Sequence, residues 1–137
     1  MPVIEELIRA EQDGTISFGN YKLGQKSKKS DFEYQGDIYK VKTFSEITKL
    51  ERNGMFVYES VPGSAVEGFK ETDSEVAFSV SAKGDVQFTL ELEPECEYEV
   101  FIDGESAGKM RTNLSGKLSV SVELSADQNV PVRVAKC

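Results

Sequence analysis

From Glu75 to the C-terminus, apolar and polar residues alternate at nearly every second position. Successive side chains of a β-strand point to opposite faces, so this period predicts half-buried strands. The breaks carry turn residues such as Asp103-Gly104. Six short strands separated by such turns predict a mainly β chain, an antiparallel β-sandwich of the immunoglobulin type. The residues expected to face its core are Val76, Phe78, Val80, Phe88, Leu90, Val100, Ile102, Leu118, Val120 and Val122.

The first half of the chain adds further strands and a short N-terminal helix to this prediction. Apolar residues of Val3–Ile8 fall on one face at helical spacing. Period-two patterns then predict strands at Thr15–Phe18, Ile38–Phe44 and Met55–Val61. The polar, lysine-rich stretch Gly24–Ser30 is typical of a loop.

A weak composition shift near residues 71–74 is the only candidate domain boundary. It divides the chain into a helix and β-rich region, 1–72, and an immunoglobulin-like sandwich, 73–137. One continuous domain is the alternative. Pro131 lies inside the last predicted strand, and because proline has no N–H to give to a sheet, we expect that strand to be an edge.

Charge and composition limit the chemistry. The 137 residues carry 16 Lys+Arg and 24 Asp+Glu, a net charge of −8, which disfavours nucleic acids and anionic membranes as partners. The absence of histidine excludes Ser-His-Asp and Cys-His catalysis and imidazole zinc sites. We therefore expect no enzyme activity, no cofactor and no metal site.

The compartment follows from what the chain lacks. It has neither a signal-peptide pattern nor an apolar run of the roughly 20 residues that span a membrane, so we expect a cytoplasmic protein. The two cysteines, Cys96 and Cys137, favour free thiols, with a disulfide between them as the alternative.

The second half of the chain resembles the last strands of immunoglobulin-like modules that are appended to bacterial polysaccharide-active enzymes. The residues that carry this resemblance are Tyr98–Gly104, Gly108, Asn113 and Ser115–Val120. The resemblance covers about half of the chain and consists mainly of turn residues. It implies a sandwich fold and, as one possibility, a carbohydrate-binding accessory module.

The chain is also similar to a family of small proteins from anaerobic Gram-positive bacteria, and these proteins often carry the label endosialidase. The segments that carry this similarity are Gly36–Thr43 and Thr48–Gly63. Sialidases resemble six-bladed propellers, and each blade needs roughly forty residues. This chain is too short for a propeller and has no tryptophan. We therefore expect no sialidase activity.

Two functions follow from these observations. The first is a non-enzymatic interaction or assembly module, which binds a protein partner or a second copy through an edge strand or the apolar face that includes Val3 and Leu7. The alternative is carbohydrate binding through exposed aromatic rings, for which Tyr21, Tyr34 and Tyr58 are the candidates. Core packing is the commoner role of such tyrosines.

Five glutamates alternate around Pro94: Glu91, Glu93, Glu95, Glu97 and Glu99. A hairpin at this point places Glu91 opposite Glu99, and such like charges destabilise a strand pair. Either a calcium ion or a basic neighbour, such as Arg111 or Arg133, offsets them. We expect the basic neighbour.

Overall fold

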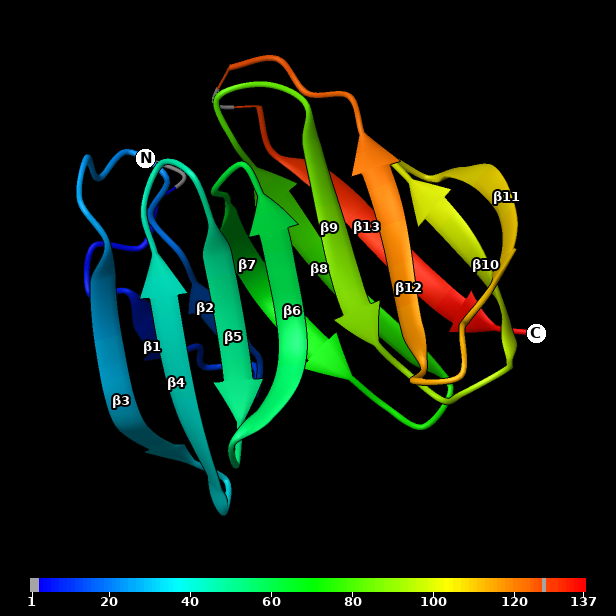
Figure 1. The fold of residues 1–137 in the computed structure, drawn as a ribbon, viewed down its shortest axis with the longest axis horizontal. Coiled ribbons are helices and arrows are strands. Elements are labelled where there is room, and N and C mark those ends of the chain that lie inside the picture. The colour runs from blue at the N-terminus through cyan, green and yellow to red at the C-terminus, as the bar shows by residue number, and fades with distance from the viewer. Residues whose placement is uncertain (1–2, 127) are drawn as a thin grey trace.

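The computed structural model describes residues 3–126 and 128–137, which form thirteen strands in two antiparallel sheets (Figure 1). Sheet A consists, in spatial order, of β1 (Ile8–Ala10), β2 (Ile16–Phe18), β7 (Ala65–Glu71), β8 (Glu75–Ser81), β13 (Val130–Lys136), β10 (Glu97–Ile102) and β11 (Glu105–Arg111). Sheet B consists of β12 (Lys117–Val122), β9 (Val86–Glu91), β6 (Met55–Val61), β5 (Thr48–Arg52), β4 (Asp37–Thr43) and β3 (Ser27–Tyr34). The described residues contain no helix, and so none that is long and apolar enough to cross a membrane.

The all-β, antiparallel prediction is confirmed, whereas the immunoglobulin type is not supported. An immunoglobulin sandwich divides seven to nine strands between its two sheets. Here the described residues form a seven-stranded and a six-stranded sheet, and the last six strands are not a separate unit, because β9 pairs with β6 of the first half. In sheet A, β7 pairs with β8 across the candidate boundary at residue 72. Strands from 1–72 and 73–137 therefore share both sheets.

Aromatic rings fill the space between the sheets. The Tyr58 ring of sheet B meets Phe18 and Phe78 of sheet A edge to face, at centroid distances of 5.4 and 5.7 Å. Phe88 lies beside Tyr58 and reaches Phe78 at 5.3 Å. Of the ten residues predicted to face the core, nine are buried and Ile102 is half-buried. The inward register derived from the alternation is confirmed.

The predicted N-terminal helix, which was expected to follow Pro2 and to end at Asp13-Gly14, is wrong. Leu7 has a φ of 72°, which is incompatible with a right-handed helix, and Ile8 begins β1 opposite Phe18. The Ile4 N–H donates to the Gly19 carbonyl at 3.0 Å, and Ile4 and Ile8 are each only 1% exposed. A helix this short is marginal on its own. The extended chain instead adds a strand to sheet A and buries both isoleucines.

Two smaller predictions also need correction. The lysine-rich stretch Gly24–Ser30 is not entirely loop, because β3 starts at Ser27 and pairs with β4. The last strand is not an edge, because β13 lies between β8 and β10. Pro131 is tolerated there because its nitrogen faces a turn and not a paired strand. The Pro131 carbonyl shows which neighbour it faces, since it accepts from the Asp103 N–H at 2.8 Å. A residue's nitrogen and oxygen face the same neighbour in antiparallel strands, so the proline nitrogen meets this turn, beyond the last paired residue of β10.

A chain of buried hydroxyl groups links the strands of sheet B to the segment that follows β6. The Thr48 hydroxyl lies 2.7 Å from that of Thr43, accepts from the Ser64 N–H at 3.0 Å and donates to the Ser64 carbonyl at 2.8 Å. The Ser64 hydroxyl lies 2.6 Å from that of Ser60 and 2.9 Å from that of Tyr58. All five side chains are fully buried. Their hydrogen bonds offset the cost of removing hydroxyl groups from water.

Burial raises the pKa of the Tyr58 hydroxyl to about 12, above its ordinary value of 10. The raised pKa stabilises the folded chain fully below pH 10, where the unfolded tyrosine is also neutral, and this contribution is lost as the pH rises from 10 to 12. We expect Tyr58 to account for about 3 kcal/mol of the alkaline loss of stability, at roughly 1.4 kcal/mol per pKa unit. Denaturant unfolding at pH 9 and pH 12 should show a smaller loss in Tyr58→Phe than in the unmodified chain. Equal losses would contradict this expectation.

Candidate binding surface

The outer face of sheet A, which points away from sheet B, carries two parallel rows of side chains. Register pairs place Phe101 of β10 opposite Arg133 of β13, and Arg133 opposite Ala77 of β8. The adjacent row runs from Pro131 through Ser79 to Glu67 of β7. The neighbours that alternate with these residues along β8 and β13 are buried in the core, so the rows themselves face outward.

An aromatic ring and a guanidinium group stand at one end of these rows. The Arg133 guanidinium carbon lies 4.2 Å from the centroid of the Phe101 ring, within cation–π distance. The same guanidinium donates to the Glu75 carboxylate at 3.2 Å. Beside this pair, the surface is hollowed into a cavity of about 560 Å³, whose lining includes Ala77 and Pro131. Apolar contact and a partly exposed positive charge therefore adjoin each other.

The opposite end is polar and held by hydrogen bonds. The Glu11 carboxylate accepts from the Ser17 hydroxyl at 2.5 Å and from the Arg9 guanidinium at 2.9 Å. These hydrogen bonds, first that from Ser17 and then that from Arg9, hold the pKa of the Glu11 carboxyl below its ordinary value. The Ser17 hydroxyl also accepts from the Gly68 N–H at 3.1 Å. This network orients Arg9 and Glu11 along the wall of a second cavity, of about 720 Å³.

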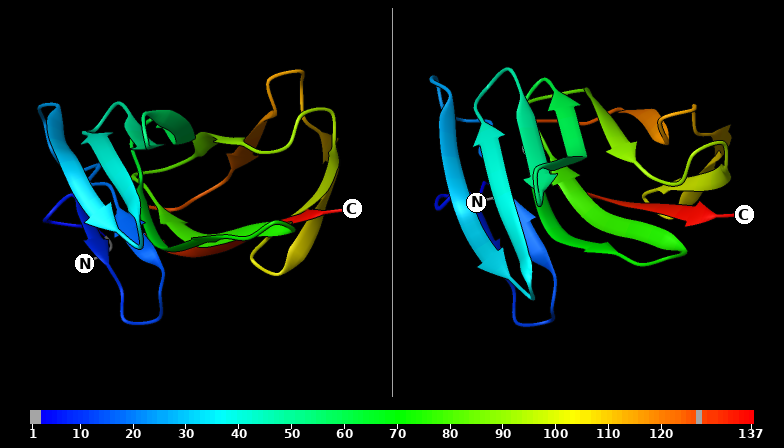
Figure 2. Two further views of the ribbon diagram at one scale, coloured as in Figure 1. Left: turned by 90° about the horizontal axis from the view of Figure 1, so that it is seen from below. Right: turned by 60° about the horizontal axis from the view of Figure 1, so that its bottom comes forward.

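The two cavities share Glu67, Gly68 and Ser79, so they form one elongated hollow across sheet A. We call it the outer groove, and it extends from Arg9 on β1 to Phe101 on β10. Figure 2 shows the β1–β2 hairpin projecting beyond the middle of sheet A on the side away from sheet B. The residues at the centre of the outer groove, such as Gly68 and Ser79, are small and leave room for an extended ligand.

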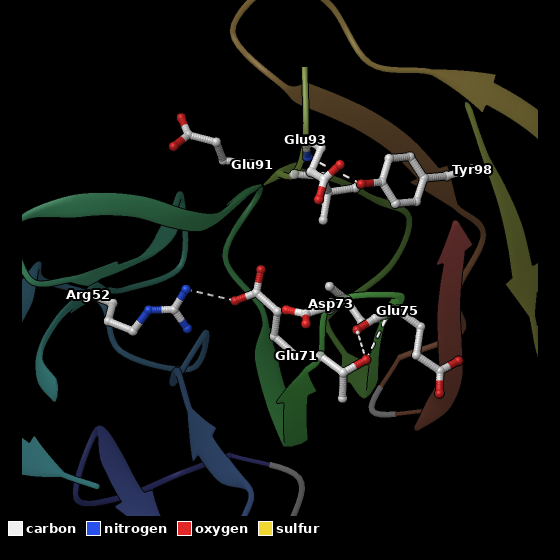
Figure 3. Close-up of a pocket in the computed structure, with 10 residues that line it drawn as sticks. Arg52, Glu71, Asp73, Glu75, Glu91, Glu93 and Tyr98 are labelled. Atoms are coloured by element: carbon white, nitrogen blue, oxygen red, sulfur yellow. Dashed lines mark hydrogen bonds and ion pairs between the residues drawn. The ribbon is translucent and has the colours of Figure 1, made fainter. Parts of the chain in front are cut away.

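A separate, acidic pocket of about 410 Å³ lies outside the outer groove, where the β7–β8 turn faces the end of β9 (Figure 3). Three of its carboxylates already have basic partners, since Glu71 accepts from Arg52 at 2.8 Å, Glu75 accepts from Arg133 at 3.2 Å and Glu93 accepts from Lys136 at 2.5 Å. The hydrogen bond and charge of Lys136 hold the pKa of Glu93 below its ordinary value. No group of three or more His, Cys, Asp or Glu side chains that fits a metal ion is found in the described part of the chain.

The predicted opposition of Glu91 and Glu99 is wrong. Strands β9 and β10 lie in different sheets, so the turn between them crosses from one sheet to the other. Glu91 is opposite Lys117, and Glu99 is opposite Lys109. Each glutamate thus has a basic cross-strand neighbour, although these lysines are not the arginines that the sequence suggested.

The five residues nominated from the sequence do not form one surface. Tyr21 and Tyr58 are 1% and 0% exposed and cannot present a ring to a ligand. Tyr34 and Leu7 are half-buried and pack against the core, and Val3 is half-buried near the N-terminus. The outer groove uses none of them.

Sequence reasoning missed the residues that form the groove. Alternation in β10 does place Phe101 outward, opposite in direction to Val100 and Ile102, but an outward aromatic residue alone does not indicate a site. Arg133 completes the pair only because β13 lies beside β10, and this pairing joins segments about thirty residues apart. The alternation in each strand gives the outward direction of Phe101 and of Arg133 separately, and only the pairing of β10 with β13 places the two side chains next to each other.

No protein-family model, no curated protein and no solved structure matches this chain significantly.

Proposed function

We propose that this chain is a non-enzymatic interaction module that binds an extended segment of a partner protein along the outer groove. The single observation that carries the proposal is the stacked pair of Phe101 and Arg133 beside an apolar hollow. Aromatic and arginine side chains dominate the binding energy of protein interfaces. An arginine stacked on a ring is also pre-oriented, so less side-chain entropy is lost on binding.

Carbohydrate binding is the second candidate, because the groove is elongated and joins an aromatic ring to polar side chains. Sugars stack on an exposed aromatic face, however, and the Arg133 guanidinium already covers one face of the Phe101 ring. The burial of Tyr21 and Tyr58 removes two further rings from such a platform. A protein segment, which gains from both the ring and the guanidinium, fits this surface better.

The two thiols support a reducing, cytoplasmic setting for this function. Cys96 is half-buried and Cys137 is exposed, and both are free. Disulfides are rare in the cytosol, where thiols are kept reduced.

We expect peptides selected against the intact chain from a random display library to bind in the outer groove. Phe101→Ala and Arg133→Ala should each weaken the binding of such peptides by about tenfold or more, as is typical of central interface residues. Arg111→Ala is the matched control, because Arg111 is an exposed arginine on β11 outside the groove, and its loss should leave the affinity unchanged. Calorimetric titration provides the affinities, and thermal unfolding verifies that each variant is folded.

Equal binding by Phe101→Ala, Arg133→Ala and the unmodified chain would contradict the proposal, as would failure to select any peptide. A glycan array probed with the same three variants tests the alternative. Glycan binding that is lost in Phe101→Ala but retained in Arg111→Ala would assign the groove to carbohydrate instead.

A further inference from the structure

Strand β12 is the most regular of the four edge strands of the two sheets. It pairs over six consecutive residues with β9 and has no register shift. By contrast, β1 has three residues, β3 is interrupted by a register shift between Lys29 and Phe32, and β11 contains Gly108 at a φ of 106°. Short or bulged edges resist pairing with another chain, whereas a regular edge is a template for it.

The backbone groups that point away from β9 can be identified. The Leu92 N–H donates to the Gly116 carbonyl at 2.6 Å, and hydrogen-bonded pairs alternate along an antiparallel ladder. Residues 118, 120 and 122 therefore bond to β9, while Lys117, Ser119 and Ser121 direct their N–H and C=O groups to the free edge. Those of Lys117 are already bonded within the chain. Its N–H donates to the Asn113 side-chain oxygen at 3.0 Å, and its carbonyl accepts from the Asn113 N–H at 3.2 Å. Ser119 and Ser121 are left as the outward-facing pair, and in the described residues no strand lies beside them.

We propose that β12 pairs with β12 of a second copy of this chain, antiparallel about a two-fold axis at Val120, so that two sheets B join edge to edge. This register makes Ser119 of one copy and Ser121 of the other a hydrogen-bonded pair, and the axis repeats the pair. It also places Lys117 opposite Glu123 of the second copy, twice per dimer. The neighbouring registers place Lys117 opposite Ser121 or Ser125, so only the axis at Val120 matches opposite charges.

The side chains at this edge set the strength of the association. Leu118, Val120 and Val122 are already buried within one copy, so dimerisation adds mainly backbone hydrogen bonds and two ion pairs. The Lys117 ammonium lies 4.4 Å from the centroid of the Phe56 ring, and its flexible stem must turn from this ring to meet Glu123 of the second copy. The dimer is therefore weak. The proposal does not depend on the outer groove, which lies on the other sheet.

Sedimentation of the intact chain between roughly 10 µM and 1 mM, a range suited to a small polar interface, should show a monomer–dimer equilibrium. Lys117→Glu and Glu123→Lys should each weaken dimerisation by about tenfold or more, because each one sets like charges opposite each other twice. An equimolar mixture of the two variants should dimerise again, since every facing pair in the mixed dimer is of opposite charge. Lys109→Glu on the exposed edge strand β11 is the control and should have no effect.

Monomer alone up to 1 mM would overturn the proposal, as would a dimer that ignores both charge reversals or a mixture that does not recover. A second measurement needs no variant. The amide resonances of Ser119 and Ser121 should shift with protein concentration, while those of Leu118 and Val120, which bond to β9, should shift little. Shifts confined to other strands would place the contact elsewhere. Loss of peptide binding in Phe101→Ala with an unchanged dimer would separate this interface from the outer groove.

Discussion

Replacing Phe88 with alanine is expected to lower the free energy of unfolding by about 3–5 kcal/mol. The Phe88 side chain is completely buried between the sheets and stacks on Tyr58 at a centroid distance of 5.9 Å. It also contacts Phe78 of the opposite sheet edge to face. Alanine removes the apolar surface that these rings cover and leaves a cavity, because strands fixed on both sides of β9 cannot close over it.

Denaturant unfolding provides the measurement, with an unchanged m-value as evidence that the same transition is observed. Phe101→Ala is the matched control, since Phe101 is a phenylalanine on the outer face of sheet A and is only half-buried. Its loss should cost less than about 1 kcal/mol, as is usual for substitutions outside the core. Similar costs at both positions would mean that the aromatic core does not sustain the fold.

Replacing Thr48 with valine should lower the free energy of unfolding by about 2–4 kcal/mol, although the two side chains have almost the same shape. The hydroxyl of Thr48 joins three groups in the buried chain, namely the N–H and C=O of Ser64 and the hydroxyl of Thr43. A methyl group in its place leaves these partners buried without a hydrogen bond. The penalty comes from their desolvation, since no cavity forms.

Thr89→Val is the control for this effect, because Thr89 also shares a hydrogen bond with another hydroxyl, that of Ser119 at 2.8 Å. This pair is exposed, so water replaces the lost bond and the cost should stay within about 0.5 kcal/mol. Equal costs for Thr48→Val and Thr89→Val, measured by thermal and denaturant unfolding, would show that burial of the hydroxyl chain is unimportant.

The sequence predicts strands better than it predicts their partners. Met55–Val61 was predicted from its turns and is β6 with the same bounds, because alternation and turn residues act within a few positions. The turn after Glu91 gives no indication of whether the next strand pairs with β9 or crosses to the other sheet. Reading it as a hairpin caused the error over Glu91 and Glu99.

The candidate site suffered from the same limit. The sequence alone does not show whether the ring of a tyrosine in a strand faces the core or solvent. Tyr58 and its neighbour Val57 are both buried, although alternation would place one of them outside. Strict alternation fails there because β5 and β6 shift register between Leu50 and Glu51. The outer groove needs the neighbours of β10 and β13, and such long-range pairing leaves no periodic signal in the chain.

The central place of β13 in sheet A determines the order in which the chain can mature during synthesis. Strand β8 emerges early, but its partner begins at Val130, 49 positions after Ser81, which takes the ribosome about 2.5–10 s at roughly 5–20 residues per second. Throughout that interval β8 presents an unpaired edge, and β10 also lacks its second partner. Sheet A is complete only after β13 has been synthesised, so a nascent chain arrested before Val130 has two strand edges, those of β8 and β10, open to other chains.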